Sequence, residues 1–217
     1  MEFDFGLVWE LAPKLFEGLV LTLQLSALTV ALGLSSGIVL GLFRVSRVLP
    51  AVQVLVKGFV YFMRGTPLLV QIYMVFFLLP RLGLTLSPYW TGVAALSLHM
   101  AAYVTEITRS AIESIHPGQG EAAVSVGLTR FQTLWIVQLP QAAKQMVPPL
   151  TNELASTIKN TSLLSVIAVF ELTKAGNSII QREFIFFEVF FIVAVYYLIV
   201  VQLVTTVANV LERRVFA

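Results

Sequence analysis

Long apolar stretches recur along this chain and limit what it can fold into. The hydrocarbon core of a bilayer is about 30 Å thick, so a helix needs about 20 mostly apolar residues to cross it. Stretches of at least this length are Leu15–Phe43, Val52–Leu79, Tyr89–Ser114, Pro148–Phe170 and Phe184–Val210. Backbone polar groups must be paired internally where they face lipid, so each stretch is expected to be helical. The sequence therefore predicts an all-α membrane protein with five transmembrane helices in a single domain, residues 1–217.

Composition supports this prediction and excludes other classes. Hydrophobic residues make up 58% of the chain and charged residues 12%, whereas a soluble domain carries about 25% charged residues. A soluble chain this apolar would expose patches large enough to aggregate. The chain has no cysteine, so it offers no disulfide and no thiolate ligand, and we expect no metal site. Lysine and arginine are scattered, so no nucleic-acid partner is expected.

The N-terminal segment MEFDFGLVWELAPK is acidic, whereas the start of a cleavable signal peptide is basic. We therefore expect no cleaved leader. The apolar side chains between Phe3 and Leu11 fit either a short helix at the outer membrane interface or a disordered tail.

The distribution of positive charge predicts the orientation, because cytoplasmic loops collect lysine and arginine. With the N-terminus outside and the C-terminus inside, nine of these residues fall on the inner side and four on the outer side. The inner set is Arg44, Arg47, Lys57, Arg64, Arg109, Arg130, Lys144, Arg213 and Arg214, and the outer set is Lys14, Arg81, Lys174 and Arg182. This orientation places residues 116–140 in the cytoplasm.

The second stretch is interrupted by Arg64-Gly65-Thr66-Pro67. Glycine and proline loosen a helix, so a kinked span is expected here. We expect Arg64 to extend its charge to the membrane interface, as long cationic side chains do. The alternative is that Arg64 caps a broken helix.

The cytoplasmic segment 116–140 is polar and long for a connection between spans. Glu121-Ala122-Ala123 places two small side chains together, and Gly127 breaks or bends a helix. The apolar residues that follow recur at helical spacing, and they are Leu128, Phe131, Leu134 and Trp135. Pro140 is expected to end this second helix. The pattern predicts a short helix, a bend and an amphipathic helix, which form either a docking surface or a mere connector.

Polar and ionisable side chains lie inside the third and fourth stretches. His99, Tyr103 and Glu106 are spaced four and three residues apart, so they share one face of a helix. In the fourth stretch the same spacing pairs Asn152 with Ser156 and Glu153 with Thr157. These stripes are expected to line one cavity, where the two carboxylates meet a substrate ammonium or cationic side chain. Tyr and Asn would bind the substrate carboxylate.

Structural roles are also open to these polar groups. Lys159 could pair with Glu106 or Glu153 in a structural ion pair, and Ser and Thr in spans often serve helix packing. His99 is as readily a packed, hydrogen-bonded side chain. Glu106, Glu153 and His99 also fit the proton relay of an ion-coupled secondary transporter. A purely structural or signalling subunit is disfavoured, because an ionisable residue at mid-bilayer costs about 2.5–3.5 kcal/mol to insert.

Three motifs, taken in order, resemble those of the permeases of ABC importers, in the branch that carries polar amino acids. The first is the EAA motif, in which Glu121, Ala122, Ala123, Gly127, Leu139 and Pro140 are in register. Val137 stands where isoleucine is usual. The second is "RGTPLLVQ" at residues 64–71 and the third is "NTSLLSVI" at residues 160–167, where Asn160 replaces the usual aspartate. The resemblance covers nearly the whole chain.

This resemblance implies a type I ABC importer permease in a bacterial inner membrane. The segment 116–140 would then be the coupling segment that docks on a cytoplasmic ATPase. The implied partners are ABC ATPase subunits, a second permease subunit, an extracytoplasmic binding protein and the amino-acid substrate. The chain lacks a G-x-x-x-x-G-K-[ST] phosphate loop, so no cofactor is expected here and ATP belongs to the partner. The chain itself would be no enzyme.

The resemblance also bears on the substrate. Permeases of this branch commonly read Asn-Ser-Gly-Ala-Tyr, two residues, Glu in the third span. Tyr103 and Glu106 match this pattern, whereas His99 replaces the asparagine and Met100 also departs from it. An acidic residue at Glu153 suits members that carry basic amino acids. The expected substrate is therefore a cationic or polar amino acid.

Overall fold

The computed structural model describes residues 5–45 and 50–216. They form the helices α1 (Phe5–Val45), α2 (Pro50–Gly65), α3 (Leu68–Arg81), α4 (Pro88–Glu113), α5 (Pro117–Ser125), α6 (Arg130–Gln132), the π-helical turn η1 (Thr133–Gln138), α7 (Leu139–Asn160), the 3-10 helix η2 (Thr161–Ile167), α8 (Leu172–Glu183) and α9 (Phe187–Phe216). No strand occurs within the described ranges. The all-α prediction is therefore confirmed.

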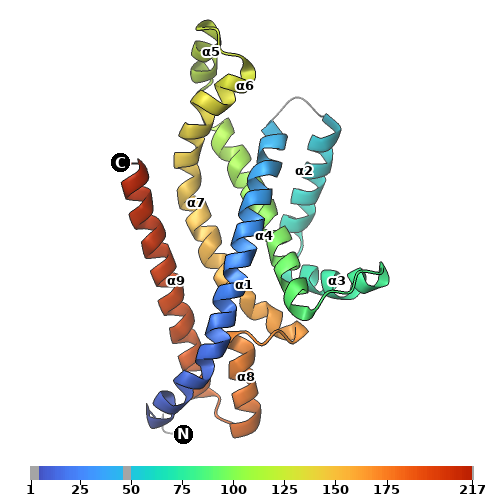
Figure 1. Ribbon diagram of the computed structural model, residues 1–217, viewed down its shortest axis with the longest axis vertical. Helices are drawn as coiled ribbons and strands as arrows, with labels where there is room; N and C mark the ends of the chain where they lie inside the picture. Colours follow the sequence, from blue (N-terminus) through green and yellow to red (C-terminus); the bar gives the residue numbers. More distant parts are fainter. Residues whose placement is uncertain (1–4, 46–49, 217) are drawn as a thin grey trace.

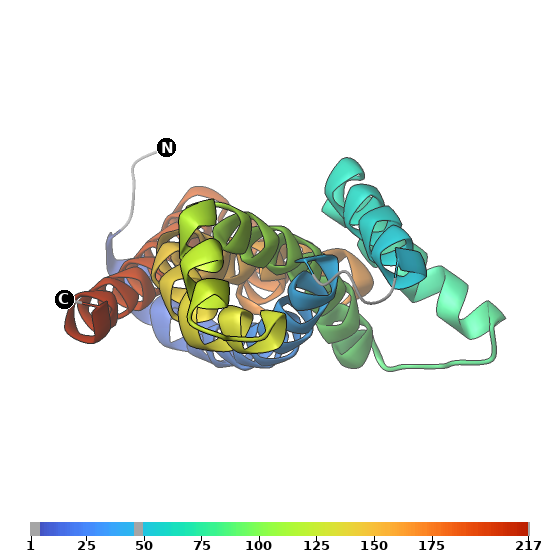
Figure 2. The ribbon, with the colours of Figure 1, turned by 90° about the horizontal axis from the view of Figure 1, so that it is seen from above.

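The long helices α1, α2, α4, α7 and α9 run along the long axis of the molecule (Figure 1). Helices α5 and α6 project at the end where α1 stops, and the start of α1 and α8 lie at the opposite end. Viewed from above, α2 and α3 extend to one side of the bundle (Figure 2). Residues 5 to 11 belong to α1 itself rather than to a separate interfacial helix, and Phe3 lies outside the described residues.

By length and composition, the helices Gly6–Val45 and Phe187–Glu212 can each cross a membrane. Two pairs of helices, each bent at a short break, can also cross if each pair counts as one span. The part of the chain that the structure describes therefore has at most four candidate spans. The expected third span coincides with α4, which has 26 residues and carries several ionisable side chains. A polar helix of this kind needs neighbours that shield it from lipid.

The second expected span, Val52–Leu79, is wrong as a single helix. The chain breaks after Gly65, and α2 and α3 meet at 114°. Pro67 stands directly before α3 with extended backbone (φ −62°, ψ 136°). A proline lacks the N–H that would continue the α2 ladder, and it disfavours helical backbone in the preceding residue. The break is therefore much sharper than the expected kink.

The expectation that Pro140 ends a helix is also wrong. Helix α6 continues through η1 and Pro140 into α7, which runs to Asn160. Pro140 occupies the first turn of α7, where the missing N–H is tolerated. The π-helical turn before it absorbs the altered hydrogen-bond register. The fourth expected span, Pro148–Phe170, therefore begins inside a longer helix, passes through η2 and ends in the connection to α8.

A row of glycines brings α1 and α4 into close contact. Gly33, Gly37 and Gly41 are spaced four residues apart on α1. A Cβ at these positions would lie 2.8 Å from Met100, 2.5 Å from Val104 and 2.5 Å from Thr108 respectively, measured to each Cβ. Small residues let helix backbones approach closely inside a membrane. This close contact, or seam, fixes the position of α4 relative to α1. It thereby also fixes the direction in which the polar face of α4 points.

The other end of the bundle is held by Glu171, whose side chain is fully buried. Its carboxylate caps α8 by accepting hydrogen bonds from the backbone N–H of Thr173 (2.9 Å) and Lys174 (2.7 Å). It also accepts one from the Tyr197 hydroxyl of α9 at 2.9 Å. The N–H of Leu172 donates to Thr22 Oγ1 of α1 at 3.1 Å. This network joins α1, α8 and α9.

Candidate functional site

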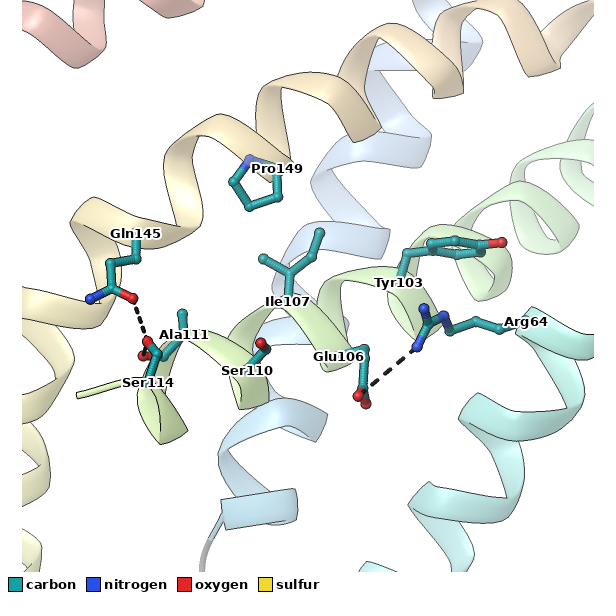
Figure 3. A pocket seen from close by; sticks show the side chains of 9 residues that line it. All are labelled: Arg64, Tyr103, Glu106, Ile107, Ser110, Ala111, Ser114, Gln145 and Pro149. Carbon is teal, nitrogen blue, oxygen red and sulfur yellow. Dashed lines mark hydrogen bonds and ion pairs between the residues drawn. The ribbon is translucent and has the colours of Figure 1, made fainter. Parts of the chain in front are cut away.

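A cleft of about 300 Å³ opens between α2, α4 and α7 (Figure 3). Its lining residues are Arg64, Tyr103, Glu106, Ile107, Ser110, Ala111, Ser114, Gln145 and Pro149. Most of them come from α4, because side chains spaced three and four residues apart share one helix face. Figure 3 shows Arg64 reaching in from α2, while Gln145 and Pro149 come from α7.

Glu106 lies between two arginines in this cleft. It accepts a hydrogen bond from Arg109 Nε at 3.1 Å, and Arg109 Nη2 also contacts it. Arg64 Nη1 lies 4.0 Å from the same carboxylate oxygen. The Arg64 guanidinium stands 5.3 Å from the centre of the Tyr103 ring, within cation–π range. The cations paired with Glu106 are therefore Arg109 and Arg64 rather than Lys159, which is exposed.

A second cleft, of about 360 Å³, continues from the first and shares Arg64 and Glu106 with it. Arg44 and Lys57 add further positive charge to its walls. The Nε atom of Arg44 is buried and has no hydrogen-bond partner within the described ranges. The lining of the second cleft is therefore positively charged, because Arg44, Lys57 and Arg64 outweigh the single carboxylate of Glu106.

His99 lies one turn before Tyr103 on α4, and the two rings are 4.9 Å apart. His99 Nδ1 lies 2.9 Å from Oε1 of Gln71 on α3. The structure thus brings His99, Tyr103 and Glu106 onto one face, as their spacing predicts. Gln71 was not singled out as a site residue, and the only sequence signal was its place at the end of "RGTPLLVQ".

The α7 residues of the predicted site are not among the residues that line this cleft. Asn152 is exposed, Glu153 and Ser156 are half-buried, and Thr157 is buried. Glu153 makes no hydrogen bond or salt bridge within the described part of the chain, and it lies within electrostatic range of Arg64. Of the two carboxylates in the predicted site, Glu106 has ion-pair partners, whereas Glu153 has none among the described residues.

The cleft also contains polar residues that sequence reasoning missed, namely Ser110, Ser114 and Gln145. Ser114 of α4 donates a hydrogen bond to the Gln145 side chain of α7. Extending the stripe of Tyr103 and Glu106 by helical spacing reaches Ser110, so this residue had a readable signal. Gln145 had none, because it precedes the apolar stretch that marked the fourth span.

The segment 116–140 forms a hairpin of α5 and α6. His116 caps α5, because its Nδ1 accepts a hydrogen bond from the N–H of Gly118 at 3.1 Å. Gly127 turns the chain with a positive φ of 89°, a conformation that favours glycine. Thr129 and Gln132 then form a capping box at the start of α6. The expected order of helix, bend and helix is confirmed.

The residues of the EAA motif differ in their exposure to solvent. Glu121 and Ala122 are exposed, whereas Ala123 is only 5% exposed and packs inside the hairpin. Leu139 is half-buried and Pro140 exposed. Large apolar side chains are exposed nearby, and they are Val124, Val126, Phe131, Trp135 and Ile136. An exposed apolar patch with polar neighbours is typical of a protein interaction site.

Known proteins resemble this chain over nearly its whole length. It is 39% identical over 216 residues to the glutamine transport system permease protein GlnP of Escherichia coli K12, covering 99% of this chain and 98% of the relative. It is 39% identical to the L-cystine transport system permease protein TcyB of Bacillus subtilis, covering 93% and 86%. It is 33% identical to the arginine transport system permease protein ArtQ of Bacillus subtilis, covering 99% and 98%.

Solved structures agree with this resemblance. A crystal structure of an amino acid ABC transporter with histidines superposes with a TM-score of 0.91 at 32% identity, covering 99% of this chain and 100% of that one. The inward-facing MetNI methionine ABC transporter, at 21% identity, shares the fold with a TM-score of 0.73. The resemblance to ABC importer permeases inferred from the motifs is thus confirmed.

One protein family matches most of the chain. Its description is "Binding-protein-dependent transport system inner membrane component", and the match spans residues 30–217. The α2–α3 break, α4 and the α5–α6 hairpin all lie within the matched range. The chain therefore belongs to the family of inner-membrane components of binding-protein-dependent transport systems.

Proposed function

We propose that this protein is the permease subunit of an ATP-driven importer of polar amino acids. The observation that carries the proposal is the polar face of α4, which lines a charged cleft inside an apolar bundle. Such a face is costly in a membrane unless it serves a solute pathway. The relatives named for glutamine, L-cystine and arginine transport support an amino-acid substrate.

In this proposal the chain crosses a bacterial inner membrane five times, with α2 and α3 together counting as one crossing. The N-terminus lies outside and the C-terminus inside. The α5–α6 hairpin and the end of α1 lie at the same end of the molecule (Figure 1). Two cations of the expected inner set belong to these elements, Arg44 in the last turn of α1 and Arg130 in α6, and this supports a cytoplasmic location.

The exposed apolar patch of the α5–α6 hairpin is proposed to dock on an ABC ATPase subunit, which holds ATP and Mg²⁺. A second permease subunit would complete the pathway, and an extracytoplasmic binding protein would deliver the amino acid at the opposite end. An ion-coupled secondary transporter is the weaker candidate. Such a carrier needs no projecting hairpin of this kind, and the relatives are ABC permeases.

The substrate is proposed to pass along α4 and α7, in contact with His99, Tyr103, Glu106 and the α7 residues Asn152, Glu153, Ser156 and Thr157. Glu106 is held by Arg109 and Arg64, so its charge is largely compensated. Glu153 has no such partner in the described part of the chain. A cationic side chain on the substrate would therefore be recognised mainly by Glu153.

Replacing Glu153 by Gln is expected to lower uptake of arginine selectively. Losing one charge-assisted contact of about 1.5–3 kcal/mol lowers kcat/KM about tenfold or more, whereas neutral glutamine loses little. Glu106→Gln is the matched control, and it should lower uptake of both substrates alike because it removes the carboxylate that Arg64 and Arg109 share. The measurement is uptake of both amino acids by the reconstituted transporter. An equal loss for both substrates in Glu153→Gln assigns Glu153 a structural role instead.

A further inference from the structure

Gln71 is a buried amide at the point where the second span breaks. It lies in the first turn of α3, with only 2% of its surface exposed. Its side chain reaches back to the end of α2 and across to α4. A buried amide is stable only when its donors and acceptor are matched. Each of its contacts therefore constrains the group at the other end.

The amide nitrogen has one possible orientation. Gln71 Nε2 lies 2.6 Å from the carbonyl oxygen of Met63 and 3.0 Å from that of Thr66. It also lies 2.9 Å from the hydroxyl of Thr66. Carbonyl oxygens only accept hydrogen bonds, so the NH₂ group must face them. The hydrogen-bond network thus assigns the amide oxygen to the side that faces α4.

This assignment places a proton on Nδ1 of His99. The amide oxygen of Gln71 lies 2.9 Å from His99 Nδ1, and an amide oxygen can only accept. Nδ1 must therefore carry the hydrogen. In a neutral imidazole the other nitrogen, Nε2, is then an acceptor. His99 Nε2 has no hydrogen-bond partner within residues 5–45 and 50–216.

We propose that Gln71 is a positioning residue that holds His99 with the proton on Nδ1 and so presents Nε2 as a hydrogen-bond acceptor to the solute. An acceptor at this place selects N–H donors, such as the ammonium or side-chain amide of an amino acid. The recognition role rests on the proposed function. The proton on Nδ1 does not, because it follows from the contacts of Gln71 alone.

Gln71 also links the α2–α3 break to His99. The carbonyls of Met63 and Thr66 lie where α2 ends, and Pro67 supplies no N–H to the carbonyl of Met63. The amide nitrogen of Gln71 donates hydrogen bonds to these carbonyls, and its amide oxygen accepts one from Nδ1 of His99. A change in the angle between α2 and α3 therefore breaks the contacts of Gln71 with these carbonyls or its contact with His99.

The test is nitrogen-15 magic-angle-spinning NMR of the assembled transporter in lipid, with labelled histidine in the permease only. The chain has two histidines, and His116 Nδ1 accepts from the N–H of Gly118. The two rings are therefore expected to show opposite tautomers, with Nδ1–H in His99 and Nε2–H in His116. His116→Asn, which preserves capping, assigns the signals. A neutral His99 with its proton on Nε2 would overturn the proposal.

A variant separates positioning from a purely structural role. Gln71→Met keeps the size of the side chain and removes both hydrogen-bonding groups. We expect its His99 to populate both tautomers, and KM for glutamine to rise roughly three- to tenfold while kcat changes little.

The same change in a His99→Asn background is the control, because asparagine has no tautomer to hold and should show a smaller KM effect. Equal KM effects in both backgrounds would overturn the recognition role. A wild type with the expected tautomer but no ATP-driven uptake would instead refute the proposed function.

Discussion

Replacing Gly127 by Asp is expected to detach the permease from its ATPase without unfolding it. Gly127 adopts a φ of 89°, a conformation that aspartate tolerates better than most residues. No described heavy atom lies within 4 Å of a Cβ at this position, so the new side chain projects into open space. A charge placed on the hairpin surface should then block docking. We expect ATP-driven uptake to fall by at least about tenfold, which corresponds to about 1.4 kcal/mol.

The matched control is Gly83→Asp. Gly83 has a φ of 82°, and a Cβ there likewise meets no described heavy atom within 4 Å. It lies in the connection between α3 and α4, far from α5 and α6 along the molecule (Figure 1). Co-purification of the ATPase with the tagged permease should be lost in Gly127→Asp and retained in Gly83→Asp. Normal ATPase binding by Gly127→Asp would show that the hairpin is a mere connector.

Gly37→Ala is expected to cause the largest loss of stability. The added Cβ would lie 2.5 Å from the Cβ of Val104 and 2.8 Å from the carbonyl oxygen of Ala101. The backbone oxygen cannot move away alone, so α1 and α4 must separate along their seam. Overpacking of this kind costs about 1–3 kcal/mol. The apparent melting midpoint in detergent, followed by size-exclusion chromatography after heating, should fall by several degrees.

Gly58→Ala on α2 provides the contrast. No described heavy atom lies within 4 Å of a Cβ at Gly58, and alanine favours a helix over glycine by about 0.8–1 kcal/mol. We expect this variant to melt at the same temperature as the wild type or above it. If Gly37→Ala and Gly58→Ala melt alike, the close approach of α1 and α4 is not what stabilises the bundle.

The sequence was sufficient for those parts of the fold that follow from periodicity and local chemistry. Apolar length located α1, α4 and α9, and helical spacing placed His99, Tyr103 and Glu106 on one face of α4. The positive φ of Gly127 agrees with the predicted bend. In each case the cause lies within a few residues of the effect.

The rest depends on contacts between elements that no local pattern encodes. Gly65 and Pro67 indicated a kink, but the 114° angle also requires Gln71 to satisfy the freed carbonyls. Pro140 stays within a helix because the π-helical turn precedes it. Glu106 was expected to be a ligand or a partner of Lys159, whereas Arg109 and Arg64 approach it in the folded chain. The spacing of three residues between Glu106 and Arg109 on α4 could have indicated their pairing from the sequence. The approach of Arg64 from α2 is visible only in the folded chain.

The most direct test of ATP-driven import uses the purified permease, its ATPase and its binding protein in proteoliposomes. Glutamine uptake is followed with ATP inside the vesicles and with ionophores that dissipate all ion gradients. We expect uptake to persist under these conditions and to stop when the ATPase is inactivated. Uptake that continues with an inactive ATPase and stops when the gradients collapse would contradict ATP-driven import and identify an ion-coupled carrier.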